Sequence, residues 1–181
     1  MNNKHKSIIK GFIVMLITIA CLYAGQALWQ NYAVGQPLDK ALKGIDGVDK
    51  VSLNKGSSIN DTISIEVNLN NTDNIKKTYD EISTKIEDTL NGRDFVLKIG
   101  DNRTAELEQA YYDINYYIQK AIMDGDFPLL EKKAQDIAAS IGSSAKVYVD
   151  DRNVYLQLDK NGHSLFSITA RNSGKIGGSF Q

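Results

Sequence analysis

The sequence begins with a long run of apolar residues and continues as shorter stretches in which apolar and polar residues alternate. Between Gly11 and Trp29 the only strongly polar side chain is that of Gln26. A helix of this length spans about 28 Å, which is close to the thickness of the hydrocarbon core of a membrane. We therefore expect a transmembrane helix at residues 11–29, preceded by an N-terminal segment at residues 1–10.

The charges on either side of the apolar run predict its orientation. Lys4, Lys6 and Lys10 precede the run without any acidic residue, whereas Asp39 and Lys40 follow it. Because positively charged flanks stay on the cytoplasmic side, the N-terminus is expected in the cytoplasm. The sequence therefore predicts a single-pass protein of the cell membrane with an extracytoplasmic C-terminal domain.

Two alternatives to a retained anchor exist. A cleaved signal peptide also has a basic start and an apolar run, and Ala24 and Ala27 supply small residues near a cleavage site. A lipoprotein signal ending at Cys21 would explain the single cysteine, but Thr18 stands where such signals usually have Leu. We prefer the anchor because the sequence stays apolar through Trp29.

Beyond a polar linker at residues 30–36, the pattern predicts an αββαβ subdomain at residues 37–103. Its first helix has Pro37 in the first turn and ends near Gly47. Two strands follow, joined by turn residues. Their one buried face is predicted from apolar residues that alternate with polar ones, namely Val51, Leu53, Ile63, Ile65, Val67 and Leu69.

The rest of this subdomain is a helix and a strand. Thr72 or Asp73 is expected to cap the helix, and Gly92 to end it. Its apolar stripe consists of Ile75, Tyr79, Ile82, Ile86 and Leu90. A third strand is expected at residues 95–99. The result is a small sheet with two helices on one face.

A second subdomain, with element order ααβββ, is expected at residues 104–172. Thr104 begins a helix that runs to about Met123, and Gly125 and Pro128 then mark a stop and the start of another helix. Three strands of an antiparallel sheet follow at residues 146–150, 154–159 and 164–171. Residues 173–181 are rich in Gly and Ser and are expected to form a flexible tail. The predicted fold class is α+β.

The helix that begins at Thr104 carries a second apolar stripe. Its broad apolar face consists of Leu107, Ala110, Tyr111, Ile114, Tyr117, Ile118, Ala121 and Ile122, and Tyr112, Tyr116 and Met123 lie nearly opposite. We expect the helix after Pro128 to cover this stripe. The alternative is another molecule, because Tyr and Met are favoured at protein interfaces. These three residues are therefore the candidate interface.

Composition narrows the function of the soluble part. All 22 acidic residues follow the apolar run, together with 18 of the 21 basic residues, so a nucleic-acid partner is disfavoured. The only cysteine, Cys21, lies inside the run, which leaves no thiol elsewhere for a disulfide, a zinc site or nucleophilic catalysis.

The remaining polar residues predict no catalytic, metal or cofactor site. Of two histidines, His5 precedes the apolar run, and His163 follows the turn residues Asn161 and Gly162, so a structural role is expected for it. The carboxylates are expected on solvated surfaces, and no glycine-rich loop is followed by a helix. We therefore expect a protein that is not an enzyme. A hydrolase of wall polymers would need two acids together in a cleft.

The element order of residues 37–100, behind a single membrane helix, resembles the ring-building motif of membrane-anchored secretion and sporulation-channel proteins. It also resembles the periplasmic modules of type IV pilus inner-membrane assembly proteins. The resemblance rests on element order and implies lateral self-association in a membrane-associated assembly, with no catalytic residues.

The leading hypothesis is therefore a membrane-anchored protein–protein interaction module of a bacterial envelope, secretion or sporulation-type assembly. The alternative is an extracytoplasmic sensory or small-ligand-binding module, with a site between the helical hairpin and the last three strands. A buried apolar pocket with a few polar groups would favour this alternative.

Overall fold

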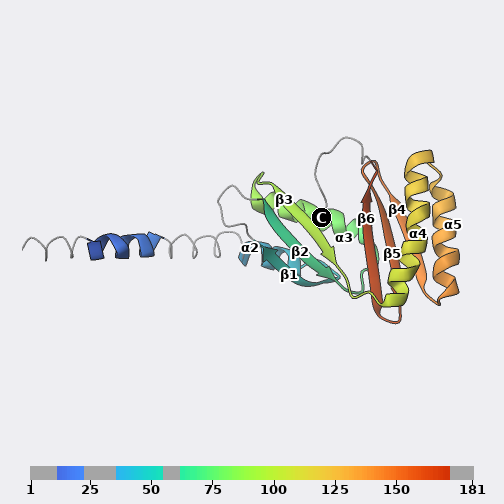
Figure 1. The fold of residues 1–181 in the computed structure, drawn as a ribbon, viewed down its shortest axis with the longest axis horizontal. Helices are drawn as coiled ribbons and strands as arrows, with labels where there is room; N and C mark the ends of the chain where they lie inside the picture. The colour runs from blue at the N-terminus through green and yellow to red at the C-terminus, as the bar shows by residue number, and fades with distance from the viewer. Residues whose placement is uncertain (1–11, 23–35, 55–61, 172–181) are drawn as a thin grey trace, which may run out of the picture.

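The computed structural model describes residues 12–22, 36–54 and 62–171 and has an α+β fold with two three-stranded sheets (Figure 1). The first sheet, sheet A, has strand order β1-β2-β3, and the second, sheet B, has order β4-β5-β6. The elements are α2 (Gln36–Lys43), β1 (Val48–Asn54), β2 (Ile63–Leu69), α3 (Ile75–Leu90), β3 (Phe95–Gly100), α4 (Ala105–Asp124), α5 (Phe127–Ser140), β4 (Ser144–Val149), β5 (Asn153–Lys160) and β6 (His163–Ala170). The predicted order, αββαβ followed by ααβββ, is confirmed.

The predicted membrane span at residues 11–29 is described only in part. Residues 12–22 are helical. Within the described ranges, no helix has both the length and the apolar character that a membrane crossing requires. Residues 11 and 23–29 of the predicted span lie outside the described residues. The expected segment 1–10, most of the linker 30–36 and the tail 173–181 lie outside the described residues.

Sheet A buries one face, as the alternation in β2 predicted. β1 pairs with β2 antiparallel, and β2 pairs with β3 parallel. Ile65, Val67 and Leu69 are buried in one core with residues of α2 and α3, so both helices lie on the same face of the sheet. This arrangement confirms the predicted sheet with two helices on one side.

The predicted cap of α3 is wrong by one or two positions. The helix begins at Ile75, and the side chain of Asn74 accepts a hydrogen bond from the Lys77 N–H at 3.0 Å. Thr72 is buried below the helix and Asp73 precedes the capping position, so neither of the predicted residues caps it.

The second subdomain begins as predicted. The Thr104 hydroxyl caps α4 by accepting from the Leu107 N–H, and Gly125 ends the helix with a positive φ of 81°. Asp126 caps α5, in which Pro128 lies in the first turn. The short connection therefore folds α5 back along α4.

Sheet B is buried on both faces, which the sequence did not predict. Val154, Leu156 and Leu158 of β5 share a core with α4 and α5. Tyr155, between them, belongs to the core of the first subdomain, and its ring packs edge-on against that of Tyr79 in α3. Figure 1 shows α4 and α5 on one side of sheet B, and sheet A with α3 on the other.

Candidate functional site

The candidate interface on α4 is exposed. The exposed fractions are 54% for Tyr112, 78% for Tyr116 and 89% for Met123. The preferred expectation, that the helix after Pro128 covers this stripe, is therefore wrong. The reason is geometric, since α5 packs against the broad apolar face of α4, where Ala110 and other small or apolar residues are buried.

The exposed stripe runs along most of α4. Tyr112 and Tyr116 are four residues apart on the same side of the helix, and Met123 continues the line about two turns further on. The Tyr112 hydroxyl lies 3.5 Å from a carboxylate oxygen of Glu108. The stripe thus presents two tyrosine rings and a methionine thioether to solvent, and its one polar contact named here is that of the Tyr112 hydroxyl with Glu108.

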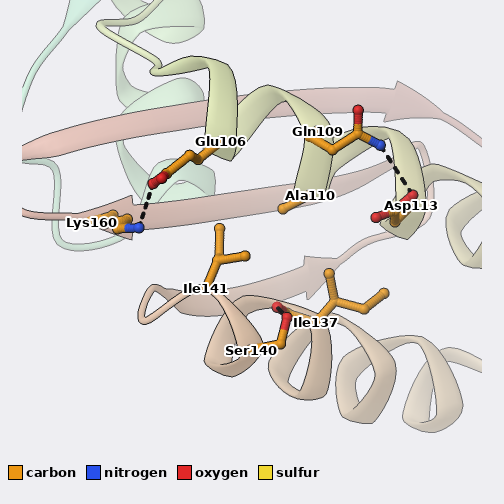
Figure 2. A pocket seen from close by; sticks show the side chains of 8 residues that line it. All are labelled: Glu106, Gln109, Ala110, Asp113, Ile137, Ser140, Ile141 and Lys160. Carbon is orange, nitrogen blue, oxygen red and sulfur yellow. Dashed lines mark hydrogen bonds and ion pairs between the residues drawn. The ribbon is translucent and has the colours of Figure 1, made fainter.

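A cleft of about 400 Å³ lies between α4, α5 and the end of β5 (Figure 2). Figure 2 shows Lys160 paired with Glu106, and Gln109 with Asp113, above Ile141 of α5. This is where the alternative hypothesis expected a ligand pocket. The lining is mixed, because Ala110, Ile137 and Ile141 share it with these polar pairs, whereas small-ligand sites are lined predominantly by apolar side chains.

Possible metal ligands do not cluster in the described part of the chain. Within residues 12–22, 36–54 and 62–171, no group of three or more His, Cys, Asp or Glu side chains is placed to hold a metal ion. His163 lies at the start of β6, where its Nδ1 is 2.9 Å from the backbone oxygen of Asn102. The neighbouring Ser164 hydroxyl donates to Asp159 instead, so these three side chains do not form a Ser/His/Asp arrangement.

A second cavity, a groove, lies between sheet A and sheet B. A groove of about 460 Å³ runs between β3 and β6, with Tyr79 of α3 and Tyr111 of α4 also lining it. Leu97 and Ile99 line it from β3, and the residues from Phe166 to Ala170 line it from β6. No pattern in the sequence pointed to this groove, because it depends on where two distant strands come to lie.

The segment between β3 and α4 is hydrogen-bonded to the start of β6. The Asp101 carboxylate accepts from the Phe166 N–H at 2.9 Å and also from two nitrogens of Arg103, at 2.7 and 2.8 Å. This hydrogen bonding to Asp101 raises the pKa of the Arg103 guanidinium. The Asn102 side chain accepts from the Ser164 N–H at 2.7 Å. These contacts hold the end of β3 against the start of β6.

No protein-family model matches this chain, and neither a curated protein nor a solved structure matches it. The resemblance to the ring-building motif therefore stays an expectation drawn from element order. Three features bear on function: the exposed stripe of α4, the cleft between α4 and α5, and the groove between the two sheets.

Proposed function

We propose that this protein is a non-catalytic, membrane-anchored module that binds other proteins outside the cytoplasm. The exposed stripe of Tyr112, Tyr116 and Met123 carries the proposal. Tyr and Met are enriched at protein interfaces, where the flexible thioether of Met adapts to the surface of a partner. Burying these side chains on a partner would remove a large apolar area from water, which favours association.

The N-terminal helix supports the membrane anchor. Large apolar side chains are exposed at six consecutive positions of residues 12–22, from Phe12 to Ile17. Six consecutive residues point in every direction around a helix, so the apolar surface is continuous around it. Such a helix requires cover by lipid or protein on all sides. We assign this cover to a membrane crossed by residues 11–29, with the lysine-flanked N-terminus in the cytoplasm.

The resemblance in element order favours one class of partner. In ring-building modules, copies of one small α+β domain associate side by side. We therefore propose self-association, or association with a related domain, within a bacterial envelope assembly of the secretion or sporulation type. Anchoring would assist such contacts, because confinement to a membrane raises the effective concentration of the domains.

Sedimentation velocity of a fragment from Gln36 to Gln181 tests the proposal. The fragment contains both hydrophobic cores, so it is expected to fold without the anchor. We expect oligomers that grow with protein concentration and that dissociate when Tyr112→Ser and Tyr116→Ser are combined. Each exposed anchor residue of an interface typically contributes about 1–2 kcal/mol or more, so the dissociation constant should rise about tenfold or more.

A matched control comes from the outer surface of α5. Gln135 and Asp136 are exposed there, and replacing both by Ser changes a similar number of side chains on a different face. This variant should associate like the unchanged fragment. A fragment that stays monomeric at high concentration, or a control variant that dissociates equally, would contradict self-association through α4.

A further inference from the structure

The charges of α4 are divided between the two halves of the helix. Glu106, Glu108 and Asp113 lie in its N-terminal half. Lys120 lies in its C-terminal half and is the only basic residue between positions 105 and 124. The backbone adds a partial positive charge at the N-terminus and a partial negative charge at the C-terminus. If a second copy of α4 packs on this helix, its direction therefore decides which charges meet.

The exposed side of α4 is arranged so that it can contact itself. Tyr116 lies near the middle of this side, opposite the buried Ile114. Gln109 and Met123 are seven residues away from Tyr116 in either direction, and both are exposed. Because seven residues are close to two helical turns, all three lie on one side of the helix. A two-fold axis at Tyr116 therefore brings Met123 of one copy beside Gln109 of the other.

The charges favour an antiparallel pair over a parallel one. In a parallel pair the two N-terminal halves lie side by side, so Glu108 and Asp113 of both copies come together, and like charges across an interface are unfavourable. In an antiparallel pair the C-terminal half, with Lys120, lies over the acidic N-terminal half of the second copy. The positive end of each helix then also lies near the negative end of the other.

The antiparallel direction brings opposite charges to the same edge of the contact. Asp113 and Lys120 are seven residues apart, so they flank the stripe on the same side of α4. A two-fold rotation about an axis perpendicular to both helices keeps this flank on the same side of the pair. Lys120 of each copy therefore comes beside Asp113 of the other, close to the ring of Tyr112, on which an ammonium group can also stack.

The contacts that these two side chains make within one chain are weak. Lys120 pairs with Asp124 one turn further on, and its side chain remains 56% exposed. Gln109 donates to Asp113 at a distance of 3.4 Å (Figure 2). Exposed contacts between residues four apart on a helix contribute little to stability. Lys120 and Asp113 can therefore pair between copies without loss of the fold.

We propose that α4 binds α4 of a second copy in antiparallel direction, with Tyr116 at the two-fold axis and Lys120 of each copy beside Asp113 of the other. This inference rests on the proposed function and specifies its partner and its geometry. Each copy uses the same surface, so the contact closes as a dimer. The dimer covers the exposed Tyr112, Tyr116 and Met123 of both copies.

Disulfide crosslinking of the full-length protein in its native membranes tests the direction of the pair. Cys21 is the only cysteine, so Cys21→Ser gives a background without thiols. Two differently tagged copies, one with Gln109→Cys and the other with Met123→Cys, are produced together and oxidised with copper phenanthroline. We expect mainly the mixed dimer. Met123→Cys alone should give at least fivefold less dimer, because the antiparallel pair separates the two positions 123 by about 21 Å along the helix.

An exchange of charges tests whether Lys120 and Asp113 meet. Lys120→Glu places an acid beside Asp113 of the second copy and should lower the yield of mixed dimer about threefold or more, as expected for two exposed ion pairs. Asp113→Lys in the same chain re-creates opposite charges between the copies and should restore the yield. Lys85→Glu is the matched control, because it breaks an exposed pair with Glu81 on α3, and it should leave the yield unchanged.

The outcomes separate this inference from the proposed function. A dimer of Met123→Cys alone that equals the mixed dimer would indicate a parallel pair and overturn the inference, while self-association would stand. The absence of a mixed dimer would also overturn it, as would a yield that Asp113→Lys fails to restore. If a benzophenone side chain at position 116 still gives a protein adduct in those cases, the proposed function stands. Loss of that adduct as well would mean that both fail.

Discussion

The Gln157 side chain in β5 accepts a hydrogen bond from the backbone N–H of Ile75, the first residue of α3, at 3.1 Å. Its Nε2 donates to the backbone oxygen of Thr72 at 2.6 Å and to the Asp159 carboxylate at 2.8 Å. Gln157 is 1% exposed. One buried amide therefore satisfies the backbone at the start of α3 and fixes sheet B to the first subdomain.

Gln157→Leu should destabilise the fold strongly. The substitution leaves the Ile75 N–H and the Thr72 C=O buried without these partners, and each unsatisfied group costs about 1–3 kcal/mol. We expect the free energy of unfolding to fall by about 2–4 kcal/mol in urea denaturation. Gln135→Leu, at an exposed position of α5, should change it by less than about 0.5 kcal/mol. Equal losses in the two variants would contradict the linking role of Gln157.

The carboxylate of Asp150 should make stability depend on pH. Burial would by itself raise its pKa, but backbone N–H groups of Asn153 and Arg152 and the Tyr155 hydroxyl donate to it and lower the pKa below its usual range. A depressed folded-state pKa adds stability that is complete well above the unfolded value of about 3.9 and is lost as the pH falls through the folded pKa.

Asp150→Asn removes this charge with little change of shape. At pH 7 the variant should be less stable by about 1–2 kcal/mol, and the difference should shrink when denaturation is repeated below pH 3. Asp136→Asn on the exposed side of α5 provides the control, with a small difference at both pH values. A deficit in Asp150→Asn that stays the same at low pH would show that the carboxylate charge is not its cause.

Gly47 approaches the buried side chain of Thr72. Its φ is +85°, and a Cβ added there would lie 2.2 Å from the Thr72 Oγ1. Gly142 has a similar φ of +68° but open space around it. Gly142→Ala should therefore cost only the backbone strain, about 1–2 kcal/mol, whereas Gly47→Ala should cost more.

Removing the Thr72 hydroxyl separates the backbone strain of Gly47→Ala from its steric clash with that side chain. The Thr72 Oγ1 is buried and has no hydrogen-bond partner among the described residues. Thr72→Ala should therefore restore part of the stability lost in Gly47→Ala, and a double-mutant cycle by thermal denaturation measures the coupling. Additive effects of the two substitutions would contradict a steric contact.

Local patterns predicted much of this fold. Alternation in β2 and the helical spacing in α3 and α4 identified their buried faces, because each face packs against a neighbour within its own subdomain. Capping at Thr104 and the turn at Asn161 and Gly162, with φ values of 51° and 78°, follow from local backbone chemistry. Such features depend on residues close in sequence.

Contacts between distant segments were not predictable in this way. Gln157 appears as a polar residue on the solvated side of a strand, and its burial depends on α3, 82 positions earlier. The groove arises because Asp101 holds β3 against β6. The stripe of Tyr112 and Tyr116 was recognised from its spacing, but whether α5 would cover it depended on the angle at which two helices pack.

The central claim is that the exposed stripe of α4 binds a second copy or a related domain while the protein is anchored in the membrane. The most direct measurement is photocrosslinking of the full-length protein in native membranes. A benzophenone side chain replaces Tyr116, and in the control it replaces Gln135. We predict a specific adduct at position 116, with a second copy or a related domain, that disappears with Tyr112→Ser, and a weak signal at position 135. No adduct at position 116, or equal adducts at both positions, would contradict the claim.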